Sequence, residues 1–161
     1  MIAHMRIDNR LIHGQVTTSW IGAVGAGLLI VANDDVAKDP IQKQMLPLAA
    51  RGVKTLVLSI QDTVDYINKG SGKEKIMILA KFPSDALALI EAGLKPLEVN
   101  VGNQAPIPGT KYKMVTKSIA VTSEDAEIYR KIENLGFHLI TQMMPSNSPK
   151  EFIKVITSKG F

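Results

Sequence analysis

The stretch RIDNRLIHGQV, residues 6–16, decides how the rest of the chain can be arranged. The mostly apolar run 1–7 predicts a strand, and the polar residues 8–10 supply turn chemistry before a helix begins. In α/β proteins, ligands and reacting groups are commonly held by loops at the carboxyl ends of strands. His13, which lies in such a loop, is therefore a candidate functional residue.

The same alternation of strands and helices continues along the chain. The predicted strands are 28–32, 54–60, 76–80, 97–101 and 137–142, with one or two more within 114–121. The predicted helices are 14–26, 41–50, 61–68, 83–92, 122–135 and 148–158, and Pro47 should kink or cut the second of them. This pattern predicts a three-layer α/β/α protein with a mostly parallel central sheet of about six or seven strands.

Length and composition set further bounds. A chain of 161 residues can bury one core, so we expect a single domain, 1–161. The formal charge of +4 comes from scattered lysines and arginines, which permit an acidic partner without requiring one. The absence of cysteine excludes a disulfide framework, a thiolate zinc site and a cysteine nucleophile.

A long segment without charged residues, 11–33, raises the question of a membrane span. Only 21–32 is continuously apolar or glycine, which is shorter than the ~20 residues that a spanning helix needs. The polar residues in its first half also argue against a secretory signal. We therefore expect a soluble, cytoplasmic protein.

Several kinds of catalytic or binding site are excluded, because the residues that they need beside His13 or in a fixed motif are missing from the sequence. An imidazole can serve as base, metal ligand or nucleophile, but no second histidine stands at metal-ligand spacing from His13. The nucleophile elbow G-x-S-x-G is missing. The glycines in 22–27 and 70–73 do not have dinucleotide-binding or P-loop spacing. His4 and His138 fall within predicted strands, where packing is the expected role.

Anion chemistry suits the stretch better. Arg10, three residues before His13, offers a planar fork of donors that matches phosphate oxygens. Gly14 allows close backbone approach, and the N–H groups of 14–16 can face an anion as the first turn of a helix. Asp8 could hold Arg10 or orient the imidazole. Spacing alone leaves this cradle and a plain exposed loop equally open.

The block 6–16 resembles the signature R-[IV]-D-[DS]-R-L-I-H-G-Q-V of a bacterial transport family. The family comprises the IIB components of the mannose/fructose/sorbose/N-acetylgalactosamine type in the phosphoenolpyruvate-dependent sugar phosphotransferase system. Trp20, residues 33–35, the loop beginning at 100–102 and the length are also similar. Asn9 stands where relatives often have Asp, so this chain offers no second carboxylate at that position.

The resemblance implies a phosphocarrier. His13 would accept a phosphoryl group from a histidine of IIA, on Nδ1, and pass it to a sugar held by the membrane components IIC and IID. Arg10 would be the principal phosphate ligand, Gly14 and Gln15 would contribute backbone N–H groups, and Asp8 would support them. The resemblance calls for no metal, cofactor or nucleic acid, allows a homodimer, and places the protein at the inner face of the membrane. The sugar would be of the mannose, sorbose or N-acetylgalactosamine type, with an amino sugar favoured.

Two functions other than a phosphocarrier fit parts of the sequence less well. A basic α/β module could bind an anion or nucleic acid, although RNA-binding motifs and interleaved aromatics are missing. A phosphatase or mutase that forms a transient phosphohistidine would need a second histidine and an acid in loop positions, and the sequence does not show this pair. Trp20 and Met45 are expected in the core rather than at a partner surface, and Asp34 and Asp35 are as readily turn residues as functional ones.

Overall fold

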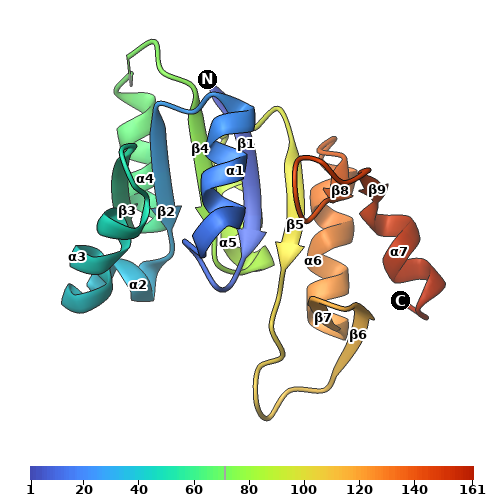
Figure 1. Cartoon of the computed structure of the whole chain (residues 1–161). Helices are drawn as coiled ribbons and strands as arrows, with labels where there is room; N and C mark the ends of the chain where they lie inside the picture. The colour runs from blue at the N-terminus through green and yellow to red at the C-terminus, as the bar shows by residue number, and fades with distance from the viewer. Residues whose placement is uncertain (71) are drawn as a thin grey trace.

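The computed structural model describes residues 1–70 and 72–161, so Ser71, in the glycine-rich 70–73 stretch, lies outside the described residues. Figure 1 shows the arrangement of the elements. The strands are β1 (Ile2–Asp8), β2 (Leu28–Ala32), β3 (Lys54–Leu58), β4 (Ile76–Ala80), β5 (Val99–Asn103), β6 (Tyr112–Thr116), β7 (Ile119–Thr122), β8 (Leu139–Thr141) and β9 (Lys150–Glu151). The helices are α1 (Gly14–Val24), α2 (Asp34–Lys38), α3 (Pro40–Ala49), α4 (Ile60–Asn68), α5 (Pro83–Glu91), α6 (Ser123–Asn134) and α7 (Phe152–Ser158).

Seven strands form the central sheet, in the order β3-β2-β4-β1-β5-β8-β9. Neighbouring strands run parallel except β8 and β9, and β6 pairs with β7 as a separate antiparallel hairpin. Every residue of β2 and β4 is buried, as expected for strands covered on both faces. The predicted fold, an α/β protein with a mostly parallel sheet of six or seven strands, is confirmed.

Helices cover both faces of this sheet. One apolar cluster joins the sheet to α1 and α2, and the other joins it to α4, α5, α6 and α7. In Figure 1, α1 crosses in front of β1 and β4, while α5 and α6 lie behind the sheet. The three predicted layers are therefore present. Among the described residues, each helix is too short or too polar to span a bilayer.

The topology places one loop in a special position. β1 and β5 are parallel neighbours, yet the chain leaves β1 toward α1 on one face and leaves β5 toward the hairpin and α6 on the other. Such a switch of direction opens a crevice at the carboxyl ends of the strands, where α/β proteins bind ligands. Residues 9–13, which connect β1 to α1, lie at this switch point.

Two short elements were not predicted. The polar turn expected at 33–35 begins α2, because the side chain of Asn33 accepts a hydrogen bond from Val36 N–H and caps the helix. The expected helix 148–158 is divided into β9 and α7, since β9 adds an antiparallel edge strand to β8. Pro47 does not cut α3, because it stands in the last turn and removes only one backbone donor.

Two further expectations were wrong. Met45 is exposed on α3, together with Ile41 and Leu48, and does not belong to the core. His138 precedes β8 and is largely exposed, with its Nδ1 2.8 Å from an oxygen of Glu133. Asp34 and Asp35, which the sequence left open between turn and functional roles, form the first turn of α2.

Candidate functional site

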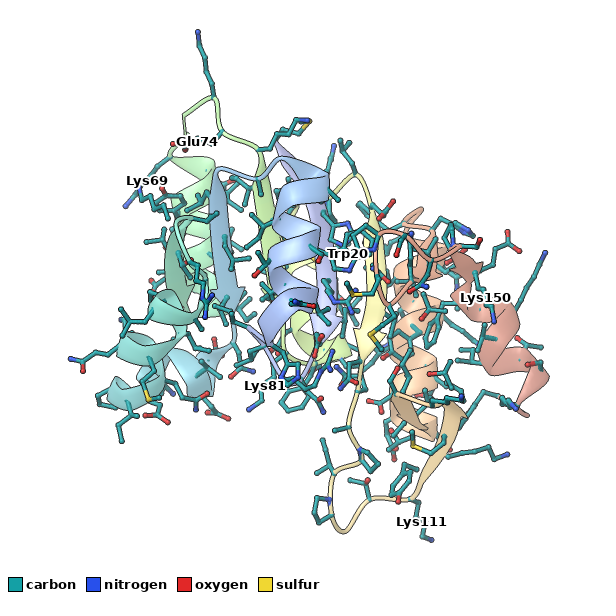
Figure 2. The ribbon with its side chains drawn as sticks, viewed as in Figure 1. Trp20, Lys69, Glu74, Lys81, Lys111 and Lys150 are labelled. Atoms are coloured by element: carbon teal, nitrogen blue, oxygen red, sulfur yellow. The ribbon has the colours of Figure 1, made fainter. Side chains whose placement is uncertain are left out.

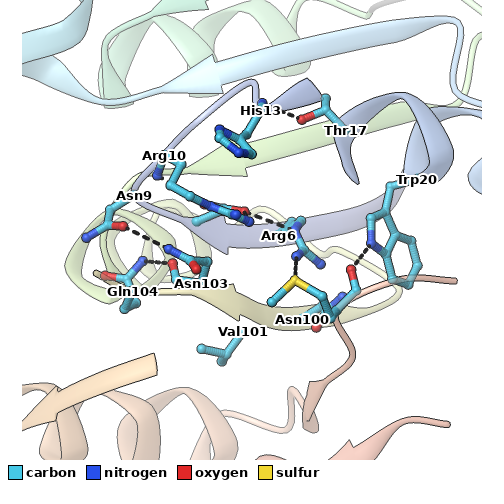
Figure 3. A network of polar contacts seen from close by, with 12 residues as sticks. Arg6, Asn9, Arg10, His13, Thr17, Trp20, Asn100, Val101, Asn103 and Gln104 are labelled. Carbon is cyan, nitrogen blue, oxygen red and sulfur yellow. Dashed lines mark hydrogen bonds and ion pairs between the residues drawn. The ribbon is translucent and has the colours of Figure 1, made fainter. Parts of the chain in front are cut away.

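His13 is the N-cap residue of α1, with extended backbone angles. Its backbone N–H donates to Thr17 Oγ1 at 2.9 Å, which fixes the loop against the first turn of the helix. Its side chain makes no capping hydrogen bond, and the residue is exposed. In Figure 3 the ring stands clear of the helix end, next to the loop that carries Arg10. The imidazole is therefore presented to solvent rather than used in the fold.

The first turn of α1 leaves backbone donors available. Among the described residues, no acceptor is bonded to the N–H groups of Gly14, Gln15 or Val16. No acidic side chain stands in this turn to offset the positive end of the helix. The turn borders an open hollow of about 670 Å³ that it shares with Leu48, Ala49 and Arg51. This helix end can therefore attract an anion from solvent.

Asp8, the last residue of β1, and Arg10, in the loop that follows, form a bidentate pair. Arg10 Nε donates to Asp8 Oδ1 at 3.1 Å, and Arg10 Nη2 donates to Oδ2 at 3.0 Å. Arg10 N–H also donates to Oδ1 at 3.0 Å. Of the two roles predicted for Asp8, the geometry favours holding Arg10, because no hydrogen bond joins Asp8 to the His13 ring among the described residues. Asp8 thus occupies Nε and one N–H of Nη2, and the two N–H groups of Nη1 and the second N–H of Nη2 are left for an anion.

Arg6 lies beneath this pair with its guanidinium fully buried. Its Nε donates to Asp8 Oδ2 at 3.4 Å, and its Nη1 donates to the carbonyl oxygen of Gln142 at 3.0 Å. Its Cζ lies 5.6 Å from the centre of the Trp20 ring. Burial lowers the pKa of Arg6, and the charge and hydrogen bond of Asp8 oppose that change. The side chain remains protonated, because arginine does not lose its proton in proteins.

Gly102 is the position in β5 that makes room for Arg6. A Cβ placed there would lie 2.1 Å from Arg6 Cζ and 2.3 Å from Nη2. Only a residue without a side chain allows the guanidinium to cross the strand at this point.

We expect Gly102→Ala to lower the free energy of unfolding by about 3 kcal/mol, because the new methyl group must displace a buried, hydrogen-bonded guanidinium. Chemical denaturation would measure the change. Gly22→Ala is the matched control, since that glycine lies in α1 with nothing within 4 Å of an added Cβ. Equal stability of the Gly102→Ala protein and the wild type would contradict the packing described.

The loop after β5 braces the His13 loop from the other side. Asn9 Nδ2 donates to the carbonyl oxygen of Ala105 at 3.0 Å, and Ala105 N–H donates to Asn9 Oδ1 at 2.9 Å. Gln104 Nε2 donates to the carbonyl oxygen of Lys81 at 2.9 Å. An Asp at position 9 could accept from Ala105 but could not donate to it. Asn9 therefore serves as a brace between loops in this chain, and Figure 3 shows its further hydrogen bond with Asn103, whose Nδ2 donates to Asn9 Oδ1 at 3.4 Å.

Leu11 gives the loop its sharp bend. Its φ is +62°, a left-handed conformation that is uncommon for a residue with a side chain. Its N–H donates to the carbonyl oxygen of Asp8 at 3.0 Å, and its side chain is buried in the cluster beneath α1. Burial of the leucine thus stabilises a strained turn that places Arg10 and His13 on the same connection.

Each of the other two histidines has a carboxylate partner, Glu98 for His4 and Glu133 for His138. His4 is buried and stacks on Trp20 with ring centres 4.6 Å apart, and its Nδ1 lies 3.0 Å from an oxygen of Glu98. This hydrogen bond holds the pKa of the Glu98 carboxyl below its ordinary value. The packed role predicted for His4 is confirmed.

Among the described residues, no group of three or more His, Cys, Asp or Glu side chains could hold a metal ion.

All five predicted site residues lie on one continuous segment, which comprises the last residue of β1, the β1–α1 loop and the first turn of α1. Sequence reasoning missed Arg6, Gly102 and Asn9 as parts of this arrangement. The signal for Arg6 was present, because a charged residue inside an otherwise apolar strand needs a buried partner. The sequence carried no comparable signal for Gly102, because its role depends on the side chain of Arg6, 96 positions earlier in the chain.

Fold and site together define a class of protein: a doubly wound α/β protein with an exposed histidine at an uncapped helix N-terminus, a setting suited to phosphoryl groups. The chain belongs to the family described as the PTS system sorbose subfamily IIB component, whose model matches residues 2–161. Its role is therefore phosphotransfer in sugar transport by the phosphotransferase system, and the resemblance found in the sequence is confirmed.

Known relatives and structures agree with this assignment. The chain is 32% identical over 152 residues to the N-acetylgalactosamine-specific phosphotransferase enzyme IIB component 2 of Escherichia coli K12, covering 94% of this chain and 96% of that protein. It is 34% identical to the mannose-specific EIIAB component of the same strain, covering 99% of this chain and 49% of that protein. The crystal structure of the IIBSor domain of the Klebsiella pneumoniae sorbose permease superposes with a TM-score of 0.93 at 32% identity, covering 100% and 99% of the two chains.

Proposed function

We propose that His13 is the residue that carries the phosphoryl group, accepting it from phosphorylated IIA and passing it to a sugar held by IIC and IID. The observation that carries the proposal is the exposed imidazole at a helix end whose first backbone donors have no bonded acceptor among the described residues. A IIB component implies both kinds of partner, and the EIIAB relative carries IIA and IIB in its name.

The transfer step needs only the two histidines. A ring nitrogen of His13 attacks the phosphorus with its lone pair and forms a new P–N bond. The P–N bond to the donor histidine of IIA breaks, and its electron pair stays on the donor imidazole. In the second step the sugar hydroxyl attacks, the P–N bond of His13 breaks, and the hydroxyl proton passes to solvent or to a base on the sugar-binding component. Each step needs positioned donors more than a strong acid or base.

The proposed roles of the neighbouring residues follow from their contacts. Arg10 would neutralise charge on the phosphoryl oxygens through the terminal N–H groups that Asp8 does not use, while Asp8 fixes its orientation through two side-chain hydrogen bonds. Gly14 and Gln15 would donate their backbone N–H groups. Because these donors lie at the surface and not in a deep pocket, two different proteins can reach His13 in turn.

A phosphorylation assay tests the proposal. When the protein is incubated with the phosphorylated IIA of its system, we expect one phosphate per chain, labile in acid and stable in alkali, as a phosphohistidine is. A chain that acquires no phosphate, or one whose phosphate survives acid, would refute the carrier role. A phosphate present without IIA would point to a different donor.

We also propose which sugar the protein serves, where it is located and which oligomeric state it can adopt. The relatives are named for N-acetylgalactosamine, sorbose, fructose and mannose. We favour an amino sugar of the N-acetylgalactosamine type, a cytoplasmic protein held at the inner membrane face by IIC and IID, and a single domain that can form a homodimer. The sugar that becomes phosphorylated when the protein is combined with its membrane components would decide the first point.

We also expect transfer from IIA to depend on salt. The net charge of +4 is distributed around the molecule, as the separated positions of Lys69, Lys81, Lys111 and Lys150 in Figure 2 show. Scattered positive charge accelerates encounter with an acidic surface, and salt screens that attraction. The second-order rate of transfer should fall several-fold when the ionic strength is raised, as stopped-flow or quenched-flow mixing would measure. A rate unaffected by salt would contradict charge complementarity with IIA.

A further inference from the structure

We propose that Arg6 is a positioning residue that sets the net charge of the phosphoryl site. It does so by neutralising Asp8, so that the charge of Arg10 stays available to the phosphoryl group. The proposal rests on the proposed function of His13, and it assigns a role to a residue that does not itself reach the phosphoryl group.

The geometry places one carboxylate between two guanidiniums. Asp8 is buried and accepts from both arginines: Arg6 Nε at 3.4 Å, Arg10 Nε at 3.1 Å and Arg10 Nη2 at 3.0 Å. Arg6 is equally buried, whereas about a quarter of the Arg10 side chain is exposed, 26%. The inner cation therefore faces only the protein, and the outer cation faces the solvent from which phosphate arrives.

The formal charges of these three residues explain why the inner cation is needed. Two guanidiniums and one carboxylate sum to +1. Without Arg6, Asp8 and Arg10 would cancel to zero, although a phosphoryl group brings between about one and a half and two negative charges. The same carboxylate that orients Arg10 would then oppose the phosphate. With Arg6 in place, Asp8 can orient the outer arginine while the cluster stays attractive to anions.

The surrounding structure is built to keep Arg6 in place. Gly102 leaves space for its guanidinium, and the Gln142 carbonyl accepts from both Arg6 Nη1 and Asn100 Nδ2, each at 3.0 Å. Arg6 Nη2 lies 3.7 Å from Met143 Sδ. The ring of Trp20 lies beside the Arg6 guanidinium, and its Nε1 donates to the Met143 carbonyl oxygen. Burying a cation is costly, so this set of contacts is expected only where the charge has a use.

The test compares variants that differ in charge at position 6. Arg6→Lys keeps a positive charge, and Arg6→Gln keeps hydrogen-bond donors but is neutral. The readout is the equilibrium constant for phosphoryl transfer between phosphorylated IIA and this protein, measured at about pH 8 so that carboxylates stay ionised. We expect Arg6→Gln to shift the constant about tenfold toward IIA, the effect of removing one partly buried charge, and Arg6→Lys to stay within about threefold of the wild type.

Two further variants separate charge from packing. Arg6→Gln/Asp8→Asn removes both inner charges and leaves Arg10 to supply +1, so the equilibrium constant should lie closer to the wild-type value than that of Arg6→Gln. The rate of transfer should still fall, because Arg10 loses the carboxylate that orients it. Arg130→Gln removes one positive charge from α6, where the guanidinium bonds Thr157 and Phe161, and should leave the constant unchanged. Circular dichroism would confirm that each protein is folded.

The outcomes are distinct. Equal constants for folded Arg6→Lys and Arg6→Gln proteins, or a shift of the same size in Arg130→Gln, would overturn the role of Arg6 and leave His13 as the carrier. If the single variants fail to fold, a tenfold shift in the doubly substituted protein would overturn it as well. A wild-type protein that takes no phosphate from IIA would instead refute the proposed function itself.

Discussion

The His13→Ala variant is expected to take up no phosphate from phosphorylated IIA, a loss of at least about a thousandfold in initial rate, as is usual when a covalent nucleophile is removed. The fold should not change, because the imidazole is exposed and makes no hydrogen bond to the helix that it caps. Neither of the other histidines can replace it, since His4 is buried against Trp20 and His138 lies at the other end of the chain beside Glu133.

His138→Ala is the matched control for this experiment, because His138 is the other histidine with an exposed side chain. That protein should incorporate phosphate at the wild-type rate. Full incorporation by His13→Ala, or its loss in His138→Ala alone, would show that the phosphoryl group resides elsewhere. Incorporation and folding should be measured on the same samples, so that a loss of activity cannot be ascribed to unfolding.

Arg10→Lys is expected to slow phosphoryl transfer about thirtyfold with little change in thermal stability. The charge is kept, but one ammonium cannot reproduce the two parallel hydrogen bonds of the fork to Asp8, at 3.1 and 3.0 Å. The lysine would therefore pair with Asp8 or turn toward the phosphate, and could not do both. Arg10 is partly exposed, which is why stability should change by less than about 1 kcal/mol.

Arg130→Lys provides the comparison for Arg10→Lys. It makes the same chemical change in a residue of α6 that bonds Thr157 and Phe161. Transfer rates should separate the two variants, while melting temperatures should not. Equal transfer rates for Arg10→Lys and the wild type would mean that the bidentate geometry has no part in transfer.

Much of the fold could be predicted because local patterns and burial agree. The strands β2 and β4 were predicted with the observed bounds, since continuous apolar runs between polar turns leave few alternatives. Helix α6 was recognised from Thr122 and Asp125, which form the capping box at its start. Element α2 was missed because it has five residues and its cap, Asn33, is equally typical of a turn, and β9 was missed because it has two residues and is defined by its pairing with β8.

The candidate site was only partly accessible to sequence reasoning. The end of β1 and the loop after it contain Asp8, Arg10 and His13, so their proximity followed from the chain itself. The arrangement beneath them did not, because Arg6 meets Gln142 across 136 positions and crosses Gly102 on a neighbouring strand. The pairing of Asp8 with Arg10 is local and was one of the two roles predicted for Asp8, but only the structure shows that two nitrogens of the Arg10 fork are bound to it.

The position of the phosphoryl group tests the central claim most directly. The protein should be phosphorylated by IIA, digested under mildly alkaline conditions that preserve phosphohistidine, and examined by mass spectrometry. The account predicts the mass of one phosphoryl group on the peptide that contains His13, and on no other peptide. Phosphate found on a peptide with His4, His138 or a residue other than His13 would contradict it.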